Sequence, residues 1–386
     1  MIKAKQQDMF LQAILFLLFF INFNNSDIKG FRFIGAFSIL LLLGISFMLF
    51  TFSINNIRFN SNNSCMYLFM SFIVLIYTAG ILNYMSVESI ITTIKISLLF
   101  IFCIVSSRFN YENYNYIKVL KFGLYLYLLI FGFEILKYGN TINIIGTNTA
   151  SLAFIICIYF CLLIYLKTKT KRSLIFVILF FTFIIINRAR TSILVTAFSV
   201  IVYFCWGIIT KKKFVYRLFI ILLILMVFVF IYLYTYSEDI EFFNILNEFS
   251  RKYFNKNFHS GRNIIWKNSF VFINEKPFLG YGSGIVPDDI FDNSGNSTHS
   301  FYIQVLLQVG WLGMMFWCLL FYSIWDMFWH TRMNKATRLS ASFFVGILIQ
   351  NMFELTFYSN KISIGIMQWL VVAIGISRAG RYSNSG

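Results

Sequence analysis

Three side chains in this sequence could together carry out chemistry on a phosphate ester: Arg190, Arg262 and His299. Arginine keeps its charge at physiological pH and holds phosphate oxygens with a fork of N–H donors, so a pair of arginines suits a pyrophosphate. Histidine can accept a proton from a hydroxyl group near neutral pH. These groups are the minimum needed to move a sugar from a lipid pyrophosphate to another hydroxyl.

Each of these residues also has a simpler interpretation. An arginine at the end of a membrane-spanning helix commonly anchors to lipid headgroups, and a histidine there can serve only as a polar cap. Taken one at a time, the three residues leave both interpretations open. Whether they form one catalytic site depends on the helices that would position them.

The composition indicates the class of protein. Of the 386 residues, 59% are apolar and 12% are charged, whereas about a quarter of the residues in a soluble domain are charged. The apolar runs reach the roughly 17–25 residues that a helix needs to cross a bilayer, and they lack the alternation of a barrel strand. We therefore expect an all-α integral membrane protein. About twelve membrane-spanning helices are expected, near residues 9–23, 33–54, 65–82, 88–106, 117–136, 150–166, 173–187, 191–209, 214–236, 301–325, 341–359 and 362–377.

The cysteines and the net charge of +17 also fit a membrane protein. All six cysteines lie inside apolar runs or at their edges, which is typical of packed thiols and not of a disulfide framework. Basic residues concentrate in short connections such as Lys167–Arg172 and Thr210–Arg217, and such loops face the cytosol. This orientation places both termini in the cytosol. The positive charge is spread over loops beside the membrane, where it can contact anionic lipid headgroups. No nucleic acid partner is therefore expected.

One connection is much longer than the others, and the same orientation places it outside the cytosol. Residues 237–300 separate a bundle of about nine spans, 1–236, from about three further spans in 301–386. A loop longer than about 15 residues usually carries function or is disordered. The sequence of this loop predicts short helices at 239–258, amphipathic and able to lie along a membrane surface, and at 261–273. The apolar side of the second helix would hold Ile264, Ile265, Phe270 and Phe272.

Three elements of this region resemble the signature of the O-antigen polymerase and O-antigen ligase superfamily of bacterial membrane glycosyltransferases. They are a Gly-Arg-x-x-x-Trp helix, a Pro-x-x-Gly-x-Gly turn, and a histidine that opens a span with Gly-x-x-Gly further along. In this chain the elements are Gly261, Arg262 and Trp266; Pro277, Gly280 and Gly282; and His299, Gly310 and Gly313. "NRARTSIL" resembles the family's arginine element before the loop, with Arg190 as the best match. The resemblance covers residues 173–325, and the order of its elements makes it specific.

The resemblance implies a glycosyl transfer that needs no metal or cofactor, with undecaprenyl-pyrophosphate-linked oligosaccharide as donor and acceptor. Arg190 and Arg262 would neutralise the departing pyrophosphate, and His299 would deprotonate the acceptor hydroxyl.

Arg188, Lys276 and Tyr281 are expected to bind the substrate beside these catalytic residues. The family further implies a bacterial inner membrane protein whose large loop is periplasmic. Membrane lipids are expected partners, and a chain-length regulator is a further candidate.

Within the superfamily, a polymerase joins repeat units and a ligase moves finished glycan to lipid A-core. The abundance of Phe, Ile, Asn and Lys indicates an AT-rich gene, which favours the polymerase. A lipid-linked oligosaccharide flippase is the alternative from another class, but it would have several charged spans and internal repeats. Asp288 and Asp289 could bind a divalent cation, although solvated loop carboxylates are the favoured interpretation.

Four ionisable residues fall within or at the edge of expected spans, which is unusual enough to suggest function. They are Glu88, Lys95, Glu134 and Glu354. Glu88 and Lys95 are two turns apart on one helical face and could form a pair. Glu354 could face an internal cavity. No chemical role follows for any of the four from the sequence.

Overall fold

A computed structural model describes residues 4–53, 61–111, 115–138, 145, 147–237, 241–254, 257–258, 261–291, 297–358 and 361–377. Over these residues the chain forms helices and no β-strand, which confirms the all-α class. The α-helices are α1 (Ala4–Leu18), α2 (Lys29–Ser53), α3 (Ser61–Asn83), α4 (Val87–Ser106), α5 (Asn115–Tyr138), α6 (Thr147–Thr168), α7 (Arg172–Ile186), α8 (Arg190–Ile209), α9 (Lys213–Thr235), α10 (Glu241–Phe254), α11 (Arg262–Glu275), α12 (Phe301–His330), α13 (Lys335–Phe353) and α14 (Ile362–Ile376). Short 3-10 helices are η1 (Ile21–Asn25) and η4 (Pro287–Asp289).

Nine helices in the described part of the chain are long and apolar enough to cross a membrane. Each of the twelve expected spans falls on a helix, but the count of twelve spans is not confirmed. α7 and α14 have 15 residues each, or about 22 Å at 1.5 Å per residue, which is shorter than the roughly 30 Å of a bilayer core. α13 is less apolar because Thr337, Ser340, Gln350 and Asn351 lie along it. The periplasmic location of the large loop stays a prediction.

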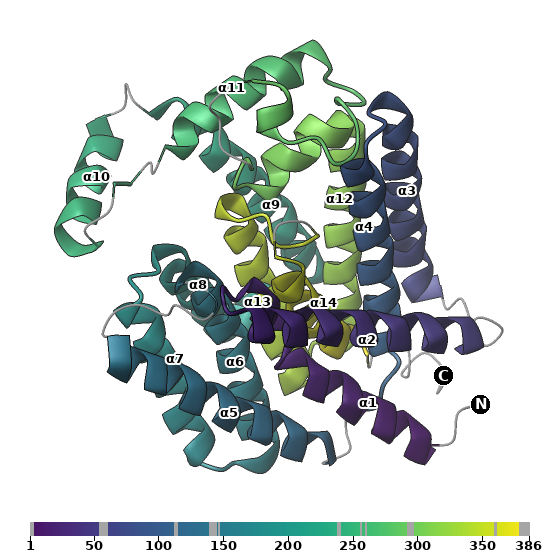
Figure 1. Ribbon diagram of the computed structural model, residues 1–386, viewed down its shortest axis with the longest axis vertical. Helices are drawn as coiled ribbons and strands as arrows, with labels where there is room; N and C mark the ends of the chain where they lie inside the picture. The colour runs from purple at the N-terminus through teal and green to yellow at the C-terminus, as the bar shows by residue number, and fades with distance from the viewer. Residues whose placement is uncertain are drawn as a thin grey trace.

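The helices form one group that runs along the molecule and another that crosses it (Figure 1). α3, α4, α9 and α12 run along the long axis, whereas α1, α2, α5 and α7 lie crosswise in the lower half of the view. α12 packs against α3, α13 packs against α8 and α14, and α6 packs against α7. α10 and α11, the two helices of the large loop, lie at the upper end, with α10 projecting to one side.

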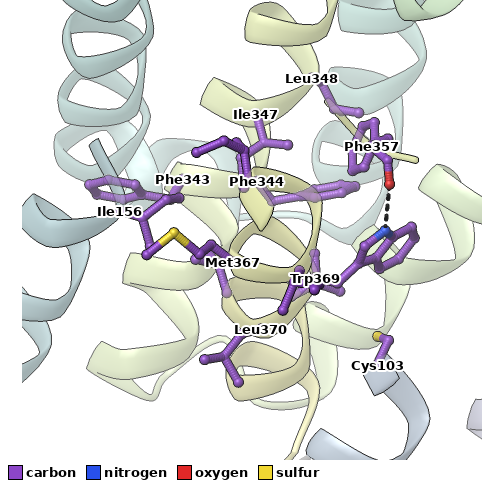
Figure 2. Packing of buried hydrophobic residues seen from close by; sticks show 14 of the residues in the cluster. Cys103, Ile156, Phe343, Phe344, Ile347, Leu348, Phe357, Met367, Trp369 and Leu370 are labelled. Carbon is purple, nitrogen blue, oxygen red and sulfur yellow. Dashed lines mark hydrogen bonds between the residues drawn. The ribbon is translucent and has the colours of Figure 1, made fainter. Parts of the chain in front are cut away.

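The hydrophobic core surrounds α14 and α6, which are apolar on every side and therefore buried on every side. Figure 2 shows Met367 and Trp369 of α14 packed among side chains of α13, α6 and α4. The Trp369 indole N–H donates to the carbonyl oxygen of Phe357 at 3.2 Å, so this buried polar group is satisfied. All six cysteines are free thiols, as expected.

α12 is interrupted at Gly310, where φ is 62° and ψ is −166°. The hydrogen bonds lost at this break are replaced by the loop at 277–282. The Trp311 amide donates to the carbonyl oxygen of Pro277 at 2.8 Å, and the Tyr281 amide donates to the carbonyl oxygen of Leu307 at 2.9 Å. Irregular backbone is tolerated inside a membrane bundle only where protein groups satisfy it in this way.

Close backbone contact explains the glycines of the Pro-x-x-Gly-x-Gly turn and of α12. A Cβ at Gly280 would lie 2.6 Å from the carbonyl carbon of Gln308, and a Cβ at Gly310 would collide with the carbonyl group of Phe278. Both glycines also have positive φ, which other residues rarely adopt. The two motif elements therefore join the large loop to the N-terminal part of α12.

Two expectations about individual side chains are wrong. The expected pair of Glu88 and Lys95 does not form in the described part of the chain, because both lie on α4 and are about 10 Å apart along its axis. α13 begins and ends six residues earlier than the expected span 341–359. Glu354 is therefore the residue that caps α13 in extended conformation, and it does not lie within a helix, contrary to expectation.

The expected apolar side of α11 is confirmed only in part. Ile264 is exposed, whereas the buried residues of the helix are Asn263, Trp266, Ser269 and Ile273. These four recur every three or four residues, as the period of a helix requires. Ile265, Phe270 and Phe272 are partly buried and pack against the core beside these residues.

Candidate functional site

The first part of the site is the turn between α7 and α8. Arg190 is the first residue of α8, and its Nη1 donates to the hydroxyl of Ser250 on α10 and to the carbonyl oxygen of Asn257 at 3.0 Å. Arg188, in the turn itself, is exposed and has a φ of 51°. The Arg190 guanidinium is thus hydrogen-bonded to two residues of the large loop, Ser250 and Asn257.

The second part is the start of α11. Gly261 precedes the helix with a φ of 76°, and Arg262 is the first helical residue. One turn later, the buried indole of Trp266 donates its N–H to the carbonyl oxygen of Thr298 at 2.7 Å. The spacing in Gly-Arg-x-x-x-Trp therefore puts the arginine and the anchoring tryptophan on neighbouring turns of one helix.

The third part is His299, in the segment that leads into α12. Its φ of 52° is unusual for a residue with a side chain. The segment is held in place by buried hydrogen bonds: the His299 amide donates to the Ser297 hydroxyl at 3.0 Å, and the Thr298 hydroxyl donates to Oε1 of Gln304 at 3.1 Å. Backbone that is held in an unfavourable conformation by its surroundings often marks a functional position.

The fourth part is Glu354, at the end of α13. Its carboxylate lies 3.4 Å from Nη2 of Arg262 and 3.7 Å from Nζ of Lys361. The side chains of Arg262 and Glu354 are only 18% and 12% exposed, so water screens this pair weakly. Glu354 therefore fixes the direction of the Arg262 guanidinium while leaving other N–H donors available.

These four parts surround one cavity of about 270 Å³. The lining residues are Asn148, Leu152, Arg188, Ala189, Arg190, Thr191, Ser192, Arg262, Ile265, His299 and Glu354. The lining has three arginines and one carboxylate, which leaves a net charge of +2 when the histidine is neutral. The cavity can bind a multiply charged anion, and an imidazole lies in its wall.

The environment of His299 keeps its imidazole neutral. Burial lowers the pKa of His299 below its ordinary value, and the positive charges of Arg262 and Lys361 lower it further. Glu354 opposes this shift but does not reverse it. A histidine that is neutral at neutral pH can act as a base toward a hydroxyl.

The comparison with known families agrees with this geometry. Residues 175–318 match a family model described as O-antigen ligase. This match, over 144 of the 386 residues, agrees with the resemblance to the O-antigen polymerase and ligase superfamily that the sequence motifs indicate. The matched segment includes Arg190, Arg262 and His299, and it ends inside α12. Among curated proteins, none matches this chain.

Glu354 lines a cavity, as expected from the sequence, but its contact with Arg262 was not predicted. It lies outside the matched segment and 55 positions after His299 along the chain. Its only signal was a carboxylate beside an apolar run, which suggested function but no partner. Asn148 and Leu152 of α6 carry no sequence signal toward this site, because nothing in an apolar run specifies which helix end faces a cavity.

Two of the six predicted site residues do not line the cavity. Lys276 lies over the ring of Tyr281, 4.4 Å from its centroid, and the Tyr281 hydroxyl donates to Glu275 at 2.5 Å. The residues that line the cavity do not include Lys276 or Tyr281, because the turn that carries them is hydrogen-bonded to the break in α12.

Asp289, one of the two carboxylates considered for a divalent cation, accepts a hydrogen bond from the Val286 amide at 2.9 Å. It therefore caps η4.

Proposed function

We propose that this chain is an O-antigen polymerase, which joins undecaprenyl-pyrophosphate-linked repeat units at the periplasmic face of the inner membrane. The observation that carries the proposal is the cavity in which Arg190, Arg262 and His299 converge. A sugar-linked lipid pyrophosphate is a dianion, which matches the charge of the lining. The match of residues 175–318 to the O-antigen ligase family model supports glycosyl transfer as the reaction.

In the proposed reaction, the neutral His299 imidazole accepts the proton of the acceptor sugar hydroxyl. The acceptor oxygen forms a bond to the anomeric carbon of the donor, and the bond from that carbon to the pyrophosphate oxygen breaks. The electron pair of the broken bond passes to the pyrophosphate, whose charge increases as it leaves. Arg190 and Arg262 stabilise this charge, and such preorganised cations are often the largest contribution to catalysis. The imidazolium then returns its proton to solvent.

Glu354 would position Arg262 rather than contact the substrate. A guanidinium that already has one fixed carboxylate partner loses less side-chain entropy when it binds phosphate oxygens. The two contacts of Glu354, to Arg262 and Lys361, also tie the start of α11 to the start of α14.

The second candidate within the superfamily is an O-antigen ligase, which the description of the matching family favours. Purified protein should be incubated with a synthetic lipid-pyrophosphate repeat unit, with and without lipid A-core. A ladder of chain lengths from the repeat unit alone supports the polymerase. Transfer that occurs only onto lipid A-core identifies the ligase. A parallel reaction with EDTA tests whether the activity needs a divalent cation.

A third outcome would overturn glycosyl transfer altogether. If the protein forms no glycosidic bond but moves the lipid-linked unit between leaflets of a vesicle, it is a flippase. The Arg262→Lys variant provides the control for the ladder, because it keeps the charge but cannot reproduce the planar fork of donors.

A further inference from the structure

A second charged cavity lies at the other end of α6 and takes no part in the proposed reaction. It has a volume of about 340 Å³ and is formed by α5, the end of α6, the turn at 168–171 and the start of α7. Its lining residues are Lys121, Leu124, Tyr125, Cys161, Ile164, Thr170, Lys171, Arg172, Ser173 and Phe176. Ile164 lines this cavity and Leu152 lines the first one, so the two are roughly 18 Å apart along α6.

Three cations of this cavity have no partner for their charge in the part of the chain that the structure describes. Among the described residues, the side chains of Lys121, Lys171 and Arg172 form no hydrogen bond or ion pair, and no carboxylate lines the cavity. The neighbouring Lys167 differs, because it donates to the carbonyl oxygen of Tyr111. The three unpaired cations form a site for an anion.

Hydroxyl groups lie beside these cations. Thr170 and Ser173 are within 3.2 Å of each other through their hydroxyl oxygens, and Thr168 is 2.8 Å from Thr170. The Thr168 hydroxyl donates to the carbonyl oxygen of Ile164. The hydroxyls of Thr170 and Ser173 therefore donate along this chain toward Thr168. The donors available to a phosphate group are therefore the N–H groups of the three cations.

The other half of the cavity is lined by apolar and aromatic side chains of α5, α6 and α7. Leu124, Cys161 and Ile164 are buried in its floor. The rings of Tyr125 and Phe176 meet edge to face with centroids 4.8 Å apart. Beyond them, the outer faces of α5 and α7 expose large apolar side chains: Phe122, Leu129, Ile175 and Ile178. A ligand with an acyl chain attached to its phosphate fits this arrangement.

We propose that this cavity binds the headgroup phosphate of an anionic membrane phospholipid, with its acyl chains along α5 and α7. Three cations without a carboxylate favour an anionic lipid over a zwitterionic one, whose own cation would be repelled. Basic pockets between membrane helices on the cytoplasmic side bind anionic headgroups in this manner. The expected orientation of the chain places the turn at 168–171 on that side.

Native mass spectrometry of the detergent-solubilised protein tests the proposal, with phosphatidylglycerol and phosphatidylcholine of the same chain length as probes. The test variant combines Lys121→Gln, Lys171→Gln and Arg172→Gln. Phosphatidylglycerol affinity should fall about fivefold for each cation lost, or on the order of 100-fold in all. The matched control removes three exposed lysines from another turn at the same end of the bundle. It combines Lys211→Gln, Lys212→Gln and Lys213→Gln, and it should leave the affinity nearly unchanged.

Three results would overturn the proposal. The first is equal loss of phosphatidylglycerol in both triple variants, which would indicate a general effect of surface charge. The second is equal affinity of the wild type for phosphatidylcholine. The third is binding of glycerol 3-phosphate as tightly as phosphatidylglycerol, which would identify a soluble phosphate as the ligand. If the first triple variant does not fold, Arg172→Gln alone carries the test, with about a fivefold loss expected.

Discussion

The indole N–H of Trp266 donates to the carbonyl oxygen of Thr298, the residue before His299, at 2.7 Å. This single bond joins the helix that carries Arg262 to the segment that carries the proposed base. Both partners are buried, so the carbonyl group has no solvent to replace the indole. The distance between cation and imidazole is therefore set by protein contacts before any substrate binds.

Replacement of this tryptophan tests the coupling. Trp266→Phe keeps an aromatic ring but leaves the Thr298 carbonyl group unsatisfied, so the protein should lose about 1–3 kcal/mol of stability. The rate of glycan transfer should fall by a further 10- to 100-fold because His299 is misplaced. Both quantities are measured on purified protein, by thermal unfolding in detergent and by polymer formation.

The control for this prediction is Trp325→Phe. Trp325 donates its indole N–H to the carbonyl oxygen of Tyr216 at 2.9 Å and lies near the other end of α12. The Trp325→Phe variant should lose about as much stability as Trp266→Phe does, but its rate of glycan transfer should fall little. If both variants lose activity equally, Trp266 is only a packing residue.

Substitution of His299 separates the base from the backbone conformation. Asparagine tolerates positive φ better than alanine does, so His299→Asn should fold with nearly normal stability. Without a base it should lose roughly 10²–10⁴ in rate. Near-normal polymer length in a strain that carries His299→Asn would contradict the assigned role.

The pH dependence of the reaction follows from the lowered pKa of His299. The base works only when neutral, so activity should hold through neutral pH and fall as the pH drops through this lowered pKa. The acid limb of kcat/KM should therefore lie below the ordinary histidine pKa of about 6.5. An acid limb above pH 6.5 would contradict the conclusion that burial lowers the pKa of His299.

The carboxylate of Glu354 should shift this limb in a predictable direction. Glu354 raises the pKa of His299, so Glu354→Gln should move the acid limb to lower pH. The rate on the plateau should fall as well, by roughly tenfold or more, because Arg262 loses its fixed partner. Loss of rate without movement of the limb would show that Glu354 acts only on Arg262.

The two arginines should not tolerate lysine. Arg190→Lys or Arg262→Lys keeps the charge but loses the planar fork of donors, and each should cost roughly 10²–10³ in rate. Lys267→Gln is a control on the exposed face of α11 and should be nearly neutral. Equal activity of the wild type and the Arg262→Lys variant would reduce the role of this residue to a point charge.

Much of the fold could be predicted from the sequence because hydropathy and helix length are local properties. The expected spans at 88–106 and 362–377 agree closely with α4 (Val87–Ser106) and α14 (Ile362–Ile376). The helix expected at 261–273 corresponds to α11 (Arg262–Glu275). The spacing of Arg262 and Trp266 also lies within one helix, so it too was available from the sequence.

What the tertiary structure decided depends on contacts between distant segments. Only the packed helices show that Glu354 holds Arg262, that Lys276 and Tyr281 do not line the cavity, and that the loop at 277–282 completes the broken α12. The sequence determined by itself which segments are apolar helices and which residues could hold a pyrophosphate. It could not determine which helix ends meet, because hydrophobic burial is non-directional. The directional contacts that select the neighbours are hydrogen bonds and ion pairs between residues far apart in the chain.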